Sequence, residues 1–162
     1  MLIHAAAGGV GTFAVQFAHW KGARVLATAS ASQAEFVRSL GADEVIDYRS
    51  TPFESVARGV DLVLDLVGGE TRKRSFAVLK ASGRLISAVE PLSEDAAQHI
   101  VHAAVFHMQP STQGLVRLAE LLDVGMIRTV VTHTYPLAQA REAWRQIMAG
   151  HTRGKIVLEV RV

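Results

Sequence analysis

A glycine-rich turn close to the start of the chain constrains the fold more than any other feature of the sequence. Leu2–Ala5 is apolar and is expected to form a buried strand, and apolar residues recur at helical spacing from Val10 to Ala18. Between them, Ala6–Gly11 has the pattern G-x-G-x-x-G with alanine in the first place. A turn of this composition between a strand and a helix predicts the first half of a βαβ unit.

Each small residue of this turn has a physical task. Ala6 permits a tight exit from the strand, and Gly8 lacks a Cβ, so backbone can approach a pyrophosphate. Gly11 lets the helix pack closely on the strand. The helix N-terminus offers unpaired N–H groups and a partial positive charge to phosphates. The turn therefore predicts dinucleotide binding, and the alternative is a tight strand–helix turn that holds no ligand.

Strand-like and helix-like segments alternate along the whole chain. Strands are expected at residues 2–5, 24–28, 44–46, 61–65, 83–88, 104–108, 129–135 and 155–160. Helices are expected between them, two of which begin at the capping residues Ser32 and Ser111, and 90–103 is expected to be loop plus helix. Such alternation predicts an α/β fold: a doubly wound parallel sheet of the Rossmann type in three αβα layers.

Composition excludes several classes of protein. The 162 residues carry a formal net charge of only +2, so neither a nucleic-acid partner nor a membrane surface is expected. The absence of cysteine excludes disulfides, thiolate metal sites and cysteine nucleophiles. No apolar run approaches the roughly 18 residues that a membrane span needs, and the N-terminus does not resemble a signal peptide. A soluble, cytoplasmic protein is expected.

The end of the second expected strand bears on cofactor choice. An Asp or Glu there would bind the ribose hydroxyls of NAD, but the first acid after the strand is Glu35. Ser30 and Ser32 can donate hydrogen bonds to a 2′-phosphate, which favours NADP over NAD; the alternative is that they only cap the following helix. The loop itself has no Lys or Arg, so Arg49, after the third expected strand, is the nearest candidate for a positive charge beside the 2′-phosphate. Lys155 is either a phosphate neutraliser or a surface lysine.

Several histidines and one basic run are further candidates for functional residues. His99 and His102 are spaced i, i+3, but no carboxylate or cysteine completes a metal site, so no metal is expected. His4 is interpreted as a core histidine, and a proton-donor role was considered for His107. The basic run Arg72–Arg74 is expected to be a solvated helix face.

Five motifs that occur in order carry a resemblance to a known family. They are Ala6–Gly11, Ser39–Asp43, Val45–Arg49, Asp65–Gly69 and Arg153–Val157. Together they resemble the cofactor-binding half of the medium-chain dehydrogenase/reductase superfamily. Within it, the chain is most similar to the zinc-independent, NADPH-dependent quinone oxidoreductases.

The resemblance implies positional roles for residues of this chain. Tyr48 would lie against the adenosine 2′-phosphate, and the loop after the second strand often holds a lysine in the family where this chain has Gln33 and Ala34. No catalytic residue is implied. The complete set of expected cofactor-binding residues is Ala6, Gly8, Gly9, Val10, Gly11, Thr28, Ser30, Ser32, Tyr48, Leu66, Val67, Gly68, Ser87, Ala88, Val89, Val105, Phe106 and His107.

The resemblance also implies a domain organisation. Residues 1–128 would form the Rossmann dinucleotide-binding domain. Residues 129–162 would be a returning segment that, in the family, joins a GroES-like catalytic domain which this chain lacks, so an exposed apolar surface, a rearranged packing or a covering partner chain is expected there. Family members pair through a strand that corresponds to Val105–Met108, which predicts a homodimer.

The function expected from these observations is that of an NADPH-binding domain. The enzyme would reduce a small-molecule quinone or enone by hydride transfer to a carbonyl or an activated double bond, with the cofactor supplying the chemistry. The alternative is a truncated dinucleotide-binding module without independent catalytic activity. A third possibility, an S-adenosylmethionine-dependent methyltransferase domain, would share the sheet and the turn but expects an acid at the end of the second strand.

Overall fold

The computed structural model describes residues 1–89 and 102–160, and the expected loop and helix of 90–103 fall almost wholly outside the described residues. Its main element is a six-stranded sheet in the order β3-β2-β1-β4-β5-β6, in which each neighbouring pair is parallel. The strands are β1 (Leu2–Ile3), β2 (Leu26–Ala29), β3 (Glu44–Asp47), β4 (Val60–Asp65), β5 (Leu79–Ser87) and β6 (His102–Val105). This order is the doubly wound one, so the predicted fold class is confirmed.

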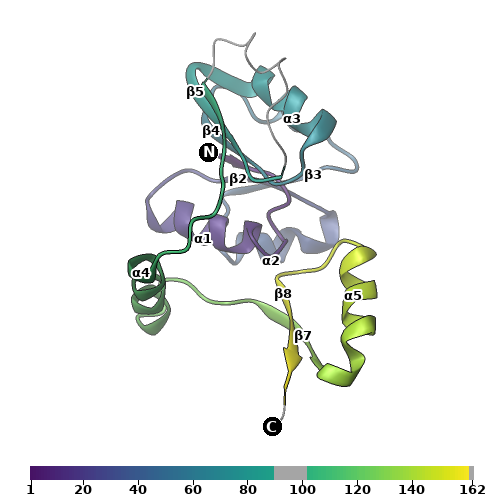
Figure 1. Ribbon diagram of the computed structural model, residues 1–162. Coiled ribbons are helices and arrows are strands. Elements are labelled where there is room, and N and C mark those ends of the chain that lie inside the picture. Colours follow the sequence, from purple (N-terminus) through teal and green to yellow (C-terminus); the bar gives the residue numbers. More distant parts are fainter. Residues whose placement is uncertain (90–101, 161–162) are drawn as a thin grey trace.

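Helices cover the two faces of this sheet (Figure 1). The elements are α1 (Gly11–Trp20), η1 (Ala31–Gln33), α2 (Ala34–Arg38), η2 (Phe53–Ser55), α3 (Gly69–Ser75) and η3 (Phe76–Val78). Successive strand residues point to opposite faces, so Ile3 packs in one core with α1 and α2, whereas Leu2 packs in a second core with η2 and η3. The central strands β1 and β2 are buried along their whole length, as expected for a parallel sheet that is covered on both faces.

Two local predictions are wrong. Ser32 does not cap a helix: it lies inside η1, and α2 begins after Gln33, whose side chain makes no capping bond. Its hydroxyl lies 3.1 Å from that of Ser30 instead. The strand expected at 104–108 is β6, which ends at Val105, and the chain then leaves the sheet ahead of Pro110. Pairing with β5 explains this end, because the ladder between the two strands stops at Ser87 and Val105.

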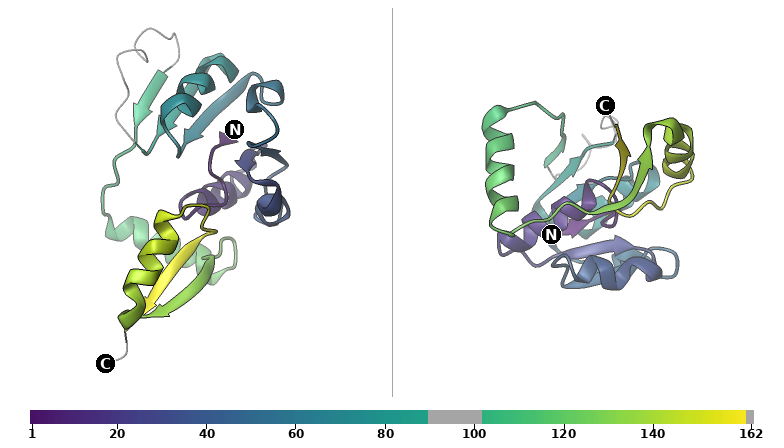
Figure 2. Two further views of the ribbon diagram at one scale, coloured as in Figure 1. Left: turned by 90° about the vertical axis from the view of Figure 1, so that its right-hand side faces the viewer. Right: turned by 90° about the horizontal axis from the view of Figure 1, so that it is seen from below.

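The last third of the chain forms α4 and a second, small sheet. The helix α4 (Thr112–Asp123) begins as predicted, since the Ser111 hydroxyl accepts a hydrogen bond from the Gly114 N–H at 3.2 Å. The strands β7 (Val131–Pro136) and β8 (Lys155–Glu159) pair in parallel, with η5 (Leu137–Gln139) and α5 (Ala140–Met148) as the crossover. Figure 2 shows this unit projecting away from the large sheet.

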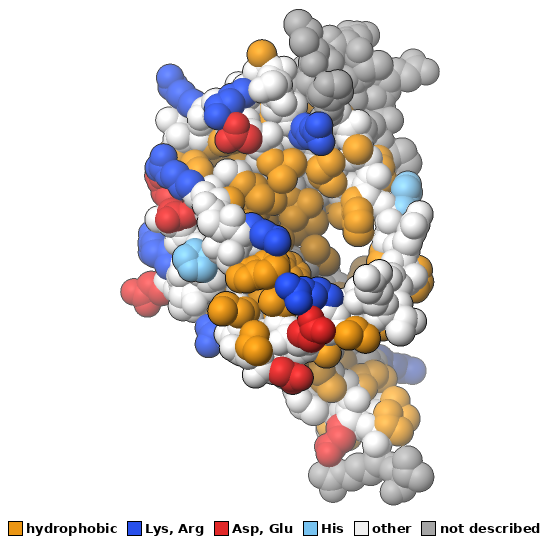
Figure 3. Space-filling model, turned by 90° about the vertical axis from the view of Figure 1, so that its left-hand side faces the viewer, with side chains coloured by type: hydrophobic (Ala, Val, Ile, Leu, Met, Phe, Trp, Pro, Cys, Tyr) orange, Lys and Arg blue, Asp and Glu red, His pale blue; other side chains and the backbone are white. Residues whose placement is uncertain are grey.

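Much of this last third exposes apolar side chains. Trp144 is 64% exposed and Met148 is 69% exposed on α5, and Leu115 on α4 is 66% exposed. A view of another side of the molecule shows hydrophobic side chains gathered around a hollow (Figure 3). Trp144 and Met148 lie within residues 129–162, where an exposed apolar surface is one of the three expectations, and the domain organisation itself stays a prediction. Among the described helices, none is long and apolar enough to cross a membrane.

Candidate functional site

A cavity of about 400 Å³ opens at the carboxyl ends of β1 and β2. It lies where the strand order reverses, because β1 pairs with β2 on one side and with β4 on the other. In open α/β sheets, ligands bind at this switch point. Five of the residues expected to contact a cofactor line the cavity, namely Gly8, Thr28, Ser30, Tyr48 and Val67.

The glycine-rich turn forms one wall of the cavity. A Cβ on Gly11 would lie 2.3 Å from the Ala5 carbonyl oxygen, so only glycine allows α1 to approach β1 this closely. A Cβ on Gly9 would meet the Lys155 side chain, with its Nζ at 2.8 Å. The Lys155 ammonium therefore lies over the backbone of Gly9. These features fit a pyrophosphate, and they favour the phosphate-neutralising interpretation of Lys155.

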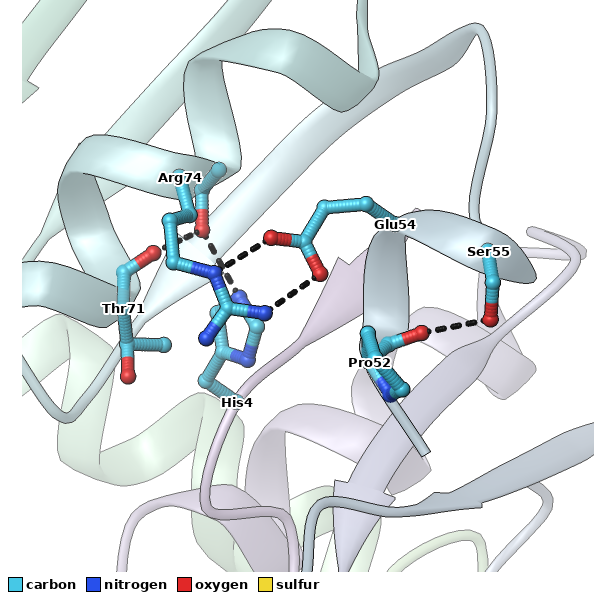
Figure 4. Close-up of polar contacts among 7 residues, drawn as sticks. His4, Pro52, Glu54, Ser55, Thr71 and Arg74 are labelled. Atoms are coloured by element: carbon cyan, nitrogen blue, oxygen red, sulfur yellow. Dashed lines mark hydrogen bonds and ion pairs between the residues drawn. The ribbon is translucent and has the colours of Figure 1, made fainter. Parts of the chain in front are cut away.

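His4 is buried at the end of β1 and also lines the cavity. Its Nε2 lies 2.9 Å from the Ser75 hydroxyl, which donates to the Thr71 carbonyl oxygen at 2.7 Å (Figure 4). Ser75 Oγ therefore accepts the Nε2–H, and His4 Nδ1 accepts from Thr28 Oγ1 at 3.1 Å. Burial lowers the pKa of His4 to about 4, so the ring is neutral near pH 7. The interpretation as a core histidine holds, and its bonds hold α3 against β1 and β2.

The basic run at 72–74 is not the uniformly solvated face that was expected. Arg72 is only 6% exposed. Arg74 lines the cavity, lies 5.0 Å from the Phe53 ring and pairs with Glu54, to which its Nη2 donates at 2.6 Å (Figure 4). The hydrogen bond to Arg74 holds the pKa of the Glu54 carboxyl below its usual value. This pair joins α3 to η2 at the edge of the cavity.

Asp65 organises the loop after β4. Its carboxylate is fully buried and accepts hydrogen bonds from the N–H groups of Val67 and Gly68 at 3.0 and 2.8 Å. Its other oxygen accepts from the Ser87 hydroxyl at 2.9 Å. The side chain of Ser87, expected near a cofactor, is therefore buried and turned toward Asp65. It ties the end of β5 to β4.

The remaining expected residues lie along the same edge of the sheet but do not line this cavity. Asp65, Ser87 and Val105 are in register across β4, β5 and β6, so the segments that follow these strands leave from one edge. These segments contain the exposed Val89 and Phe106. The expected residues outside the cavity wall are Ala6, Gly9, Val10, Gly11, Ser32, Leu66, Gly68, Ser87, Ala88, Val89, Val105, Phe106 and His107.

The segment before β8 also contributes to the cavity wall, which the sequence did not predict. His151 and Thr152 line the cavity together with Ser30 and Gln33. The segment is attached to the glycine-rich turn, because the Gly154 N–H donates to the Ala7 carbonyl oxygen at 2.9 Å. The Arg153–Val157 motif was the available signal, but it did not indicate that residues so far along the chain return to this cavity.

The described residues contain no group of three His, Asp or Glu side chains that could hold a metal ion. His99 and the side chain of His102, the spaced pair named in the sequence, lie outside the described part of the chain.

Comparisons with known proteins agree with this geometry. The family model described as zinc-binding dehydrogenase matches residues 40–158. The mitochondrial NAD(P)H oxidoreductase RTN4IP1 of Danio rerio is 32% identical over 99% of this chain and 49% of its own length. Among solved structures, the quinone oxidoreductase of Coxiella burnetii superposes with a TM-score of 0.95 and 35% identity, covering 99% of this chain and 52% of that one.

A third match bears on the ligand. The Escherichia coli quinone oxidoreductase, solved in complex with NADPH, has a TM-score of 0.82 and 29% identity, over 98% of this chain and 56% of that chain. This chain thus spans about half the length of each of the three proteins.

Proposed function

This chain belongs to the zinc-binding dehydrogenase family, and from that membership we propose that it is the NADPH-binding part of an oxidoreductase that reduces quinones or activated double bonds. The observation that carries the proposal is the cavity at the strand-order reversal, with the glycine-rich turn on one wall. The likeness to NAD(P)H and quinone oxidoreductases supports the same reaction class.

Residues of the cavity and beside it fit the pyrophosphate and the 2′-phosphate of such a cofactor. The turn at Gly8 and Gly9 and the Lys155 ammonium would hold the pyrophosphate. Ser30 and Tyr48 would hold the adenosine 2′-phosphate, and no carboxylate stands at the end of β2 to repel it. When bound, the dinucleotide supplies a hydride, and the protein binds and orients it.

A fluorescence titration that compares NADPH with NADH tests this assignment. We expect NADPH to bind at least about tenfold more tightly, because a charge-assisted hydrogen bond contributes more than about 1.4 kcal/mol. Tyr48→Phe should reduce the preference, whereas Tyr135→Phe, whose hydroxyl bonds Gln146 away from the cavity, should not. Equal or tighter binding of NADH would contradict the 2′-phosphate assignment.

Oxidation of NADPH with a simple quinone separates this function from the second candidate, a module that binds dinucleotide without catalysis. This chain spans about half the length of the related enzymes that it matches. Turnover by this chain at rates usual for the whole relatives would eliminate the second candidate. Within the proposal, the chain belongs to the zinc-independent branch, and metal analysis of the purified protein tests this.

The domain organisation and assembly follow from the same proposal. Residues 1–128 would form the cofactor domain, and residues 129–162 would pack against a catalytic domain of the GroES type. A homodimer would form beside β6, where Phe106 is 58% exposed and Met108 is 72% exposed. Sedimentation of the wild type and of Phe106→Ser tests the dimer.

A cytoplasmic location is also proposed, and imaging of a fluorescent fusion would check it.

A further inference from the structure

We propose that His151 positions the Tyr48 hydroxyl and the Arg49 guanidinium to bind the adenosine 2′-phosphate of NADPH, and that it thereby determines the preference for the phosphorylated cofactor. The inference rests on the proposed function and adds a residue that lies far along the chain from the glycine-rich turn. Between Thr28 and Glu35, the segment that follows β2 carries no Lys or Arg. A positive charge at this end of the cavity must therefore come from elsewhere in the fold.

Three groups that can donate hydrogen bonds meet at the rim of the cavity. His151 Nδ1 lies 3.3 Å from Tyr48 Oη, and His151 Nε2 lies 3.5 Å from Arg49 Nη2. Arg49 Nε donates to Tyr48 Oη at 3.4 Å. Since Arg49 can only donate, His151 Nε2 accepts from it in the neutral ring, and Nδ1–H donates to Tyr48 Oη. The Tyr48 hydroxyl proton is then left to bond an acceptor from outside.

The charges around this cluster favour an anion. Within the described chain no Asp or Glu lines the cavity, whereas Arg49, which bonds Tyr48 and His151, brings a guanidinium to its rim. The nearby carboxylate of Asp47 is occupied by the turn that holds Arg49, because it accepts from the Arg49 N–H at 3.2 Å and from the Ser50 hydroxyl at 2.9 Å. A phosphate oxygen would thus meet donors only, which gives the strong, charge-assisted kind of hydrogen bond.

The backbone holds His151 in this position at a cost. Its φ is 58°, in the left-handed region, and only Ala5 shares a positive φ among the described non-glycine residues. Such a conformation costs on the order of 1 kcal/mol and persists where the surroundings impose it. Arg153 provides that restraint: its Nε donates to Gln33 Oε1 at 2.6 Å, and its guanidinium lies 4.4 Å from the Phe36 ring.

Paired ligands isolate the 2′-phosphate from the rest of the cofactor. Adenosine 2′,5′-bisphosphate carries this group, and adenosine 5′-monophosphate lacks it. In calorimetric titrations, we expect His151→Asn to weaken the bisphosphate about tenfold and to leave the monophosphate within about twofold. Tyr48 and Arg49 lose the ring that orients them, which is equivalent to the loss of about one charge-assisted bond to the phosphate. Asparagine tolerates the left-handed conformation, so the variant removes the imidazole and not the backbone shape.

Matched variants make the outcome decisive. His133→Asn removes an exposed histidine of β7 outside the cavity wall and should change neither affinity. Arg49→Gln is a second, independent route to the same selective loss and serves if His151→Asn does not fold. An equal change for both ligands, or no change for either, in the folded variants would overturn the role of His151. Failure of the unmodified protein to bind either ligand would instead overturn the proposed function.

Discussion

The buried His4 predicts a specific loss of stability in mild acid. Its pKa is lowered by burial from 6.5 to about 4 in the folded chain, so the unfolded chain binds this proton first as the pH falls. Stability is therefore fully present above about pH 6.5 and is lost as the pH falls toward 4. A shift of this size corresponds to about 3 kcal/mol in total, of which about 2 kcal/mol is lost between pH 7 and pH 5.

Urea denaturation at pH 7, 6 and 5 measures this loss, and His4→Gln is the matched variant. Glutamine cannot be protonated here, but its amide keeps one donor for Ser75 and one acceptor for Thr28. Its free energy of unfolding should lack the loss of about 2 kcal/mol between pH 7 and pH 5. Glu54, whose pKa is also lowered, loses its contribution only below about pH 4.5 and is common to both proteins. Parallel pH profiles for the two proteins would refute the reasoning.

Three further substitutions test the turn, a helix and the pyrophosphate site. Gly11→Ala places a Cβ 2.3 Å from the Ala5 carbonyl oxygen, so urea denaturation should show a loss of about 1–3 kcal/mol or no folded protein. Gly114→Ala, which meets only ordinary contacts with Ser111 inside α4, should instead raise the free energy of unfolding by about 0.5–1 kcal/mol. Lys155→Met should weaken adenosine 5′-diphosphate and NADPH by similar factors in calorimetric titrations, because its ammonium lies over Gly9 and away from the 2′-phosphate subsite; selective loss of NADPH would contradict this placement.

The sequence predicts the large sheet because its strands and its first turn depend on residue types at neighbouring positions. The turn Ala6–Gly11 needs small residues at fixed positions, and the apolar run within Asp61–Asp65 needs two buried faces. The same reasoning failed at Ser32, where the chain enters a 3-10 turn before α2. The residue type of Ser32 suggests a helix cap. Where the helix begins, however, depends on where β2 ends and on the 3-10 turn that follows it.

Side-chain directions at the site could not be predicted, because they depend on partners distant in sequence. Ser87 stands at the expected strand end, but the buried carboxylate of Asp65 draws its hydroxyl away from the cavity. Arg74 belongs to a run typical of a solvated face, but Glu54 and Phe53 on η2 bring it to the cavity wall. For both Ser87 and Arg74, the sequence gives the place in the chain, but a contact with a residue distant in sequence decides where the side chain points.

The phosphate preference in the proposed site is therefore a property of the assembled fold. The glycine-rich turn offers backbone N–H groups that any dinucleotide can use, so it cannot distinguish NADPH from NADH by itself. The distinguishing residues, Arg49 and His151, come from the turn after β3 and from the segment before β8, which lie 102 residues apart. The bonds that keep that segment in place include Gly154 to the turn and Arg153 to Gln33. A change that frees it should abolish the preference before it abolishes binding.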